Sequence, residues 1–196
     1  QKINVNGSSG DTVRISLAVE DKNGCKGDTV LHLIIDTLPE PFVDNDTICF
    51  GSNAVEFDAG IGWKLNTWTW GSNSEITQKI NVNGSSGDTV RISLAVEDNN
   101  GCKGDTVLHL IIDTLPEPFV DNDTICFGSN AVEFDAGAGW KVNTWAWDGN
   151  SEITQKINVN GSSGDTVMIS LAVEDDNGCK GDTVLHLIID TLPEPF

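Results

Sequence analysis

The sequence predicts an all-β protein made of small β-sandwich domains in tandem. Three observations predict this: a 77-residue sequence repeat, short segments in which apolar and polar residues alternate, and Gly/Asn/Asp turns between those segments. No segment shows a sustained helical period. Five to seven short strands fit into each repeat, which suits a small β-sandwich.

The repeat sets the domain organisation. Residues 1–77 reappear at 78–154 with six differences, and residues 155–196 begin a third copy. Near-identity at this period favours an array of autonomous modules over one domain built from halves. A tandem array suits a stalk or a multivalent binder better than an enzyme, which rarely gains from copying its whole active site.

Proline marks the boundaries between modules. All six prolines lie in Leu-Pro-Glu-Pro phrases, and alternate prolines fix φ and remove hydrogen-bond donors. Each phrase is therefore expected to be a stiff, extended connector. Cutting after each phrase predicts the C-terminal half of a repeat at 1–42 and complete repeats at 43–119 and 120–196. We expect the chain to be an excerpt of a longer array.

The strands can be placed within one repeat. In the clearest one, 89–96, Val90, Ile92, Leu94 and Val96 share one face. A turn is expected before it at 83–87, and Asp98–Gly101 predicts a hairpin turn after it. Residues 106–112 are expected to form the final strand. Earlier strands are expected at Val55 and Phe57, at Ile80 and Val82, and at Trp68 and Trp70; Trp70 and Trp147 are expected to fill the core beside a disulfide.

Charge narrows the class of partner. The chain has 196 residues, with 30 Asp and Glu against 11 Lys and Arg, giving a formal net charge of −19. This disfavours nucleic acid and anionic membrane surfaces as partners. Hydrophobic residues make up 38% of the chain and six residues are Trp, so a folded core is expected. No run of about 18 apolar residues occurs, so no membrane insertion is expected in this segment.

Five cysteines predict a disulfide framework. They lie at 25, 49, 102, 126 and 179, with separations that alternate between 24 and 53 residues. Two pairings are considered: within repeats (Cys49–Cys102 and Cys126–Cys179) or across the connector (Cys25–Cys49 and Cys102–Cys126). A strand of about nine residues after Cys25 carries the chain roughly 30 Å away, which favours the within-repeat pairs. Free buried thiols are the alternative. Regular spacing indicates an oxidising, extracellular setting.

The order of motifs resembles a known family. Asp123-Thr-Ile-Cys126, then Trp145-Ala-Trp147, then Ala172-Val-Glu-Asp-Asp-Asn-Gly-Cys179 is similar to the Ig-like/PKD-like tandem repeat of giant Bacteroidota cell-surface proteins, of the gliding-motility adhesin type. The resemblance covers the whole repeat and implies Ig-like domains in a linear array. It also implies a stalk or filament. Trp68 and Trp145 depart from it, since they stand where the family usually has Tyr.

A short motif predicts modification. Asp-Thr-aliphatic resembles the Bacteroidota O-glycosylation acceptor and is far more frequent than the composition explains. The alternative is a turn that enters a strand, with Asp in the turn and Thr in the sheet. The candidate acceptors are Thr12, Thr29, Thr37, Thr47, Thr89, Thr106, Thr114, Thr124, Thr166, Thr183 and Thr191.

Acidic residues at the connector raise a metal hypothesis. Asp113, Glu117, Asp121 and Asp123 follow one another along it, and hard oxygen ligands at a joint suit Ca²⁺. Solvated acidic surface is the simpler explanation. No other cofactor is expected, because the sequence has neither a phosphate-binding loop nor a Cys/His nucleophile pair.

Histidine and tryptophan positions give two further expectations. His32, His109 and His186 are one position copied inside an apolar strand, so we expect partly buried or sheet-facing side chains. Trp63 and Trp140 follow Gly and are candidates for an exposed sugar-binding platform.

The sequence thus predicts a structural, non-enzymatic protein at the cell surface. The expected role is an extracellular stalk or filament of a bacterial surface adhesin. Expected partners are neighbouring repeats of the same chain, with lateral self-association or surface glycans as further possibilities. The alternative is a carbohydrate-binding array that uses exposed Trp side chains.

Overall fold

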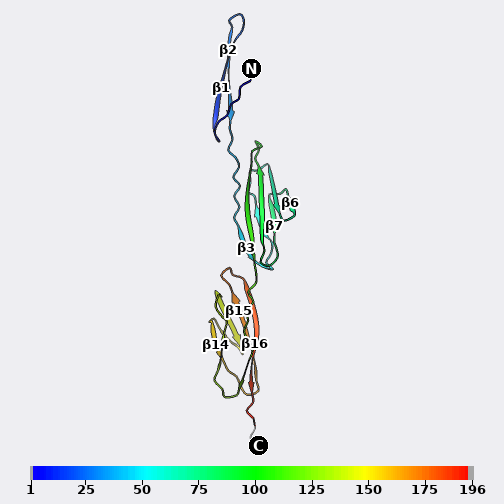
Figure 1. The fold of residues 1–196 in the computed structure, drawn as a ribbon, viewed down its shortest axis with the longest axis vertical. Helices are drawn as coiled ribbons and strands as arrows, with labels where there is room; N and C mark the ends of the chain where they lie inside the picture. Colours follow the sequence, from blue (N-terminus) through cyan, green and yellow to red (C-terminus); the bar gives the residue numbers. More distant parts are fainter. Residues whose placement is uncertain (1, 194–196) are drawn as a thin grey trace. The chain divides into compact units, whose positions relative to one another are not determined.

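A computed structural model describes residues 2–193, and every regular element among them is a β-strand, as predicted (Figure 1). Among these described residues, seven strands fall in each of the repeats 43–119 and 120–196, and two fall in 1–42. The strands are β1 Thr12–Glu20, β2 Lys26–Ile34, β3 Asp46–Cys49, β4 Val55–Asp58, β5 Leu65–Trp70, β6 Asn73–Glu75, β7 Lys79–Val82, β8 Thr89–Glu97, β9 Lys103–Asp113, β10 Asp123–Cys126, β11 Val132–Asp135, β12 Val142–Trp147, β13 Asn150–Glu152, β14 Lys156–Val159, β15 Thr166–Glu174 and β16 Lys180–Asp190.

The repeat at 120–196 is a two-layer sandwich. One layer has the strand order β10-β16-β15-β12-β13, and the other is the pair β11-β14. Phe134 and Ile157 from the small layer lie in one buried cluster with Trp145, Leu171 and Leu187 from the large layer. This cluster is the core that the alternating strands predict, because every second residue points between the layers.

One pairing in this sandwich is parallel. β10 runs beside β16 from Asp123↔Leu187 to Cys126↔Asp190, while the other strand pairs are antiparallel. The parallel pairing places the end of β10 beside the end of β16. It therefore fixes where Cys126 lies.

The repeat at 43–119 has the same element order. Its sheets are β3-β9-β8-β5-β6 and β4-β7, and β3 pairs with β9 in the same parallel register, with Cys49 opposite Asp113. Val90 is half-buried and Ile92, Leu94 and Val96 are buried, which confirms the predicted inward face of that strand.

The core Trp residues differ from the prediction. Trp68 and Trp145 are fully buried, whereas Trp70 and Trp147, which we expected in the core, are only half-buried. Trp145 pairs with Leu171 in the middle of β15, while Trp147 is the last residue of β12 before the turn into β13. The side chain nearer the strand centre therefore fills the core.

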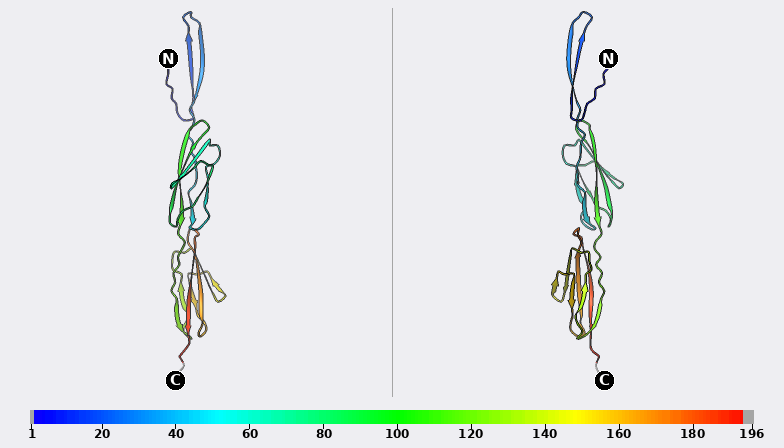
Figure 2. Two further views of the ribbon diagram at one scale, coloured as in Figure 1. Left: turned by 90° about the vertical axis from the view of Figure 1, so that its right-hand side faces the viewer. Right: turned by 60° about the vertical axis from the view of Figure 1, so that its left-hand side comes forward.

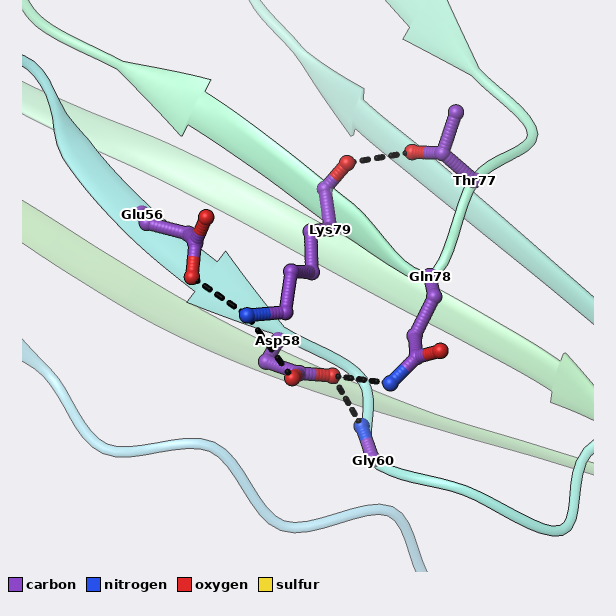
Figure 3. A network of polar contacts seen from close by, with 6 residues as sticks. All are labelled: Glu56, Asp58, Gly60, Thr77, Gln78 and Lys79. Atoms are coloured by element: carbon purple, nitrogen blue, oxygen red, sulfur yellow. Dashed lines mark hydrogen bonds and ion pairs between the residues drawn. The ribbon is translucent and has the colours of Figure 1, made fainter.

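A polar network ties β4 to β7 (Figure 3). Lys79 Nζ lies 2.6 Å from Glu56 Oε1 and 3.5 Å from Asp58 Oδ2. Asp58 Oδ1 accepts hydrogen bonds from the Gly60 backbone N–H at 2.8 Å and from Gln78 Nε2 at 3.1 Å. The Gly60 hydrogen bond and then the Gln78 hydrogen bond lower the pKa of Asp58, with a further contribution from the Lys79 charge. The same network recurs 77 residues later around Asp135.

Residues 1–42 form a hairpin that is a sheet of its own. β1 and β2 pair antiparallel from Thr12↔Ile34 to Glu20↔Lys26, and both are drawn in blue in Figure 2. Leu17 and Leu31 are more than half exposed. This segment has no counterpart of residues 43–77, which supply β3 to β7 in the next repeat.

The chain divides into two compact units, and the division passes through the repeat at 43–119. One unit comprises Gln1–Asn45, Val55–Val82 and Arg91–His109; the other comprises Asp46–Ala54, Asn83–Val90 and Leu110–Phe196. Each unit thus joins part of that repeat to a neighbouring one. The boundaries after Phe42 and Phe119 stay a prediction.

Candidate functional site at the repeat junctions

The segment expected to be a stiff, extended connector lies along the last strand of the repeat that follows it. Asp113 accepts a hydrogen bond from Asn177 Nδ2, and Asn122 Oδ1 accepts one from the His186 backbone N–H at 2.7 Å. One residue further on, the β10–β16 pairing begins. Residues 113–126 therefore run beside 177–190 with a constant offset of 64 residues.

Glycine allows this close approach. A Cβ built on Gly181 would lie 1.9 Å from the carbonyl oxygen of Pro116, so no other residue fits there without a shift of backbone. The same contact occurs at the preceding junction, where residues 36–45 lie along 100–109. There a Cβ built on Gly104 would lie 1.9 Å from the carbonyl oxygen of Pro39. No strand is assigned at 35–45 or 114–122, as the prolines predict, because proline has no N–H to donate to a sheet.

The preceding junction repeats the polar contacts as well. Asn100 Nδ2 donates to Asp36 Oδ2, and the His109 backbone N–H donates to Asn45 Oδ1 at 2.7 Å. The two junctions therefore share one set of contacts, 77 residues apart.

The hairpin loop at each junction is shaped by an aspartate, as its Asp-x-Asn-Gly sequence predicts. Asp175 Oδ1 accepts hydrogen bonds from the backbone N–H of Asn177 at 3.0 Å and of Cys179 at 2.8 Å. Gly178 takes a positive φ of 83° to close the turn. The loops at Asp21 and Asp98 make the same pair of hydrogen bonds. The loop therefore presents its cysteine in one geometry in every copy.

A disulfide crosses the junction. Cys49 at the end of β3 is bonded to Cys179 in the hairpin loop, with a Cα–Cα distance of 5.3 Å and a sequence separation of 130 residues. Cys49 lies opposite Asp113, and Asp113 binds Asn177 in the loop that carries Cys179. The junction contacts thus bring the two cysteines together.

The predicted within-repeat pairs, Cys49–Cys102 and Cys126–Cys179, are therefore corrected. Cys126 lies opposite Asp190 at the end of β16, whereas Cys179 directly precedes Lys180 at its start. An 11-residue strand separates these ends by roughly 35 Å, far beyond the ~7 Å that a disulfide allows. The observed bond is a third pairing, which joins Cys49 to the hairpin loop of the next repeat.

Among residues 2–193, three cysteines are free: Cys25, Cys102 and Cys126. Cys25 and Cys126 are exposed, and Cys102 is half-buried. Burial, and then the neighbouring charges of Asp98 and Asp36, raise the pKa of the Cys102 thiol, so this thiol favours its protonated form.

The acidic residues of the connector are not gathered into a metal site. Within residues 2–193, the one group of potential ligands within 4.8 Å of one another is Asp36, Asp98 and Cys102. The expected quartet of Asp113, Glu117, Asp121 and Asp123 does not form such a group in that part of the chain. Calcium at the connector stays a hypothesis drawn from the sequence.

Most candidate glycosylation sites are accessible. Nine of the eleven threonines are exposed, and Thr106 and Thr183 are half-buried. Exposure is required for an acceptor hydroxyl, and these nine threonines meet that requirement. Glycosylation at these positions stays a prediction.

The remaining candidates are tryptophans and histidines. Trp63 and Trp140 are half-buried, and their indole N–H groups donate to the carbonyl oxygens of Ala59 and Ala136 at 2.8 Å, which does not favour an exposed sugar platform. His109 and His186 are half-buried as expected, whereas the copy in the hairpin, His32, is exposed.

The fold defines an all-β protein of the tandem β-sandwich class. Neither a protein-family model nor a curated protein sequence gives a significant match to the chain. No helix in the described residues is long and apolar enough to cross a membrane.

Several solved structures show a weak similarity to the chain. The chain is similar to the fibronectin(III)-like modules of CbhA from Clostridium thermocellum, with 12% identity and a TM-score of 0.38 over 79% of this chain and 95% of that one. It is similar to a 1.5-MDa bacterial ice-binding adhesin, with 17% identity and a TM-score of 0.47 over 95% and 76% of the two chains. A Ca²⁺-stabilized adhesin of an Antarctic bacterium is 14% identical, with a TM-score of 0.44 over 92% and 57%.

Proposed function

We propose that the chain is part of an extracellular structural protein, a stalk or filament of a bacterial surface adhesin, with no catalytic role. The single observation that carries the proposal is the disulfide that joins one repeat to the next, Cys49–Cys179. An enzyme domain has no evident use for such a link. A stalk needs each repeat held to its neighbour.

The junction supports this role by more than the disulfide. The connector is packed along the following repeat, and the same contacts recur at both junctions. In our proposal the domains are 43–119 and 120–196, preceded by the second half of another at 1–42. Contacts that repeat with the sequence period allow any number of copies to be joined in the same way.

The disulfide and the charge support a place outside the cell. Structural disulfides persist in oxidising compartments. A net charge of −19, carried by near-identical copies, spreads negative charge evenly along the chain and keeps a long array soluble. A bacterial cell surface, O-glycosylation of exposed Asp-Thr sites and an origin in Bacteroidota belong to the same proposal and rest on the sequence resemblance.

Two measurements test the proposal. Antibodies raised against residues 43–196 should label intact cells of the source organism, and external protease should remove the label. The purified chain should resist a broad-specificity protease at 114–119 when oxidised and be cut there after reduction, while the Cys25→Ser variant should behave like the native chain. Labelling only after permeabilisation, or equal cleavage in both redox states, would overturn the proposal.

Modification is tested separately. The mass of the protein isolated from its source should exceed the polypeptide mass of 21.0 kDa for this segment, with the excess located on Asp-Thr peptides. A bare polypeptide mass would remove glycosylation from the proposal and leave the stalk role in place.

A further inference from the structure

The repeat period extends the observed cross-link to cysteines that it leaves free. Cys49 and Cys126 occupy the same strand position and are called the strand cysteines; Cys25, Cys102 and Cys179 occupy the same loop position and are called the hairpin cysteines. The disulfide Cys49–Cys179 joins a strand cysteine to the hairpin cysteine of the following repeat. We infer that Cys102 and Cys126 are sites for the same disulfide with further copies of this repeat, so that the array is cross-linked at every junction.

The loop at Cys102 already has the geometry of a bonded site. The Cys102 backbone N–H donates to Asp98 Oδ1 at 2.9 Å, and the corresponding bond at Cys179 is 2.8 Å. Asn100 binds Asp36 just as the equivalent asparagine binds Asp113 beside the disulfide. The loop and connector hydrogen bonds beside the bonded hairpin cysteine are therefore present at the free one.

Room for the partner is also present. A hollow of about 370 Å³ is lined by Ile34, Asp36, Asn100 and Cys102. At the other junction Cys49 occupies this place, because it lies opposite the residue equivalent to Asp36 and is bonded to the residue equivalent to Cys102. A strand cysteine from a preceding copy of the repeat fits the same position.

Cys126 is the strand cysteine of a second, equivalent disulfide site, at the junction with a following copy of the repeat. It lies opposite Asp190 as Cys49 lies opposite Asp113. The residue after it is held in the same way in both repeats: the Phe127 N–H donates to the Asp190 carbonyl at 2.9 Å, and the Phe50 N–H donates to the Asp113 carbonyl at 2.8 Å. The partner that fits Cys126 is a loop of sequence Asp-x-Asn-Gly-Cys in a further repeat.

This assignment also accounts for the cluster of Asp36, Asp98 and Cys102. The same three positions at the other junction are Asp113, Asp175 and Cys179, and there the cysteine is in a disulfide. Both carboxylates already accept hydrogen bonds from the protein. Asp36 accepts one from the Asn100 side chain, and Asp98 accepts two from backbone N–H groups of the loop. The cluster is thus explained as a disulfide site that lacks its partner, without a metal ion.

The chemistry is thiol–disulfide exchange with a low-molecular-weight disulfide such as oxidised glutathione. The exposed strand cysteine, as thiolate, attacks one sulfur of the oxidant and releases one thiol. The hairpin cysteine then attacks the mixed disulfide and releases the second thiol. Two protein thiols are oxidised to one disulfide, the oxidant is reduced to two thiols, and the protons lost by the cysteines are taken up by the leaving thiolates.

A chain extended at its N-terminus tests the inference. A copy of residues 43–77 placed before Gln1 supplies one strand cysteine and completes the first repeat. After oxidation in glutathione buffer, non-reducing peptide mapping should show the added cysteine bonded to Cys102, with Cys49–Cys179 unchanged and Cys25 and Cys126 alkylated. Replacing Cys102→Ser should leave the added cysteine free, whereas Cys25→Ser should change nothing.

A second arm tests Cys126. A copy of residues 120–196 placed after Phe196 should bond its hairpin cysteine to Cys126. In the chain extended at its N-terminus, a bond between the added strand cysteine and Cys25 would overturn the inference. In the chain extended after Phe196, a Cys126 that stays free would also overturn it. So would a Cys102 that stays free and is protected from alkylation by Zn²⁺. The inference can fail independently of the proposed function. If Cys49–Cys179 forms and the further bonds do not, the stalk role survives. If Cys49–Cys179 itself is missing, the proposed function loses its main support.

Discussion

The hairpin β1–β2 and the strands β8–β9 have almost the same sequence, yet they are buried differently. β1 and β8 both read TVRISLAVE. Leu17 in β1 is 54% exposed, whereas the equivalent Leu94 in β8 is fully buried. β2 has 9 residues and ends at Ile34, whereas β9 has 11 residues and ends at Asp113.

The difference separates what is local from what is not. The turn at Asp21 or Asp98 and the alternation of side chains form a hairpin in either setting. Burial requires the strands supplied by residues 43–77. The last residues of β9 are in a strand where β3 pairs with them, which the first hairpin lacks.

The largest expected effect tests this contrast directly. Leu94→Ala should destabilise the chain by about 3 kcal/mol, because it leaves a cavity in a closed core. Leu17→Ala, in an identical sequence, should cost less than about 0.5 kcal/mol. Urea unfolding followed by far-UV circular dichroism measures both. An equal loss in the two variants would mean that the face of the hairpin is covered in solution.

The disulfide gives the next contrast. Cys179→Ser should lower the free energy of unfolding by roughly 2–4 kcal/mol under oxidising conditions, since it opens a long covalent loop. Cys25→Ser changes the same loop position where no bond exists, so it should have no measurable effect. Adding reductant should bring the native chain to the stability of the Cys179→Ser variant and leave that variant unchanged.

The close approach of the connector comes third. Gly181→Ala places a methyl group against the Pro116 carbonyl and should cost about 2 kcal/mol, as overpacking does. Gly27→Ala, at the same position in the first hairpin, meets only Val19 at 3.8 Å and should cost far less. Thermal midpoints compare the two variants. Protease cleavage at 114–119 should rise only for Gly181→Ala.

A smaller effect distinguishes the two complete repeats. The β12–β13 turn has positive φ at Asp148 and Gly149, which fits a type I′ turn, whereas the β5–β6 turn has positive φ at Gly71 but not at Ser72, which fits type II′. Gly149→Ser should therefore cost about 1 kcal/mol. Ser72→Gly should change stability by less than about 0.5 kcal/mol. Similar losses in urea unfolding would show that the turn types are not fixed by these residues.

The smallest effect is the dependence on pH. Hydrogen bonds from backbone N–H groups, then from glutamine side chains, lower the pKa of Asp58 and Asp135 below the ordinary value of 3.8. The fold thus prefers the ionised carboxylates, so their contribution is complete above the ordinary pKa and is lost as the pH falls through the folded-state pKa. A variant with Asp58→Asn and Asp135→Asn should lose less stability than the native chain between about pH 5 and pH 2. The thermal midpoints of the native chain and of the variant are measured as the pH is lowered. An equal fall in both midpoints would contradict this prediction.

Local features of the fold could be predicted from the sequence. Alternation placed the strand at 89–96 and its inward face, and the turn residues placed the hairpin at Asp98–Gly101. The choice between Trp68 and Trp70 for the core could not be predicted, because both lie on one face of β5. Trp68 faces Leu94 at the centre of β8, and only the register between strands distinguishes them.

The junction was predicted only in part. Proline correctly excluded a strand in the connector, but no local pattern reveals that Pro39 or Pro116 packs on a glycine 65 residues later. The disulfide was missed because it depends on the parallel pairing of β3 with β9, which puts Cys49 at the far end of its repeat from Cys102. Glycines at 104 and 181, at the start of a strand, were the available signal of a close neighbour.

The disulfide also decides which part of the backbone can be stretched. When the chain is held at its two ends, tension passes from Cys49 through the sulfur atoms to Cys179, and the backbone between them carries none. That backbone spans 130 residues and, fully extended, is roughly 450 Å of contour length withheld from elongation. The oxidised molecule can therefore lengthen only through its first 49 residues and its last 18, so a thiol reductant in the surroundings sets how far it extends.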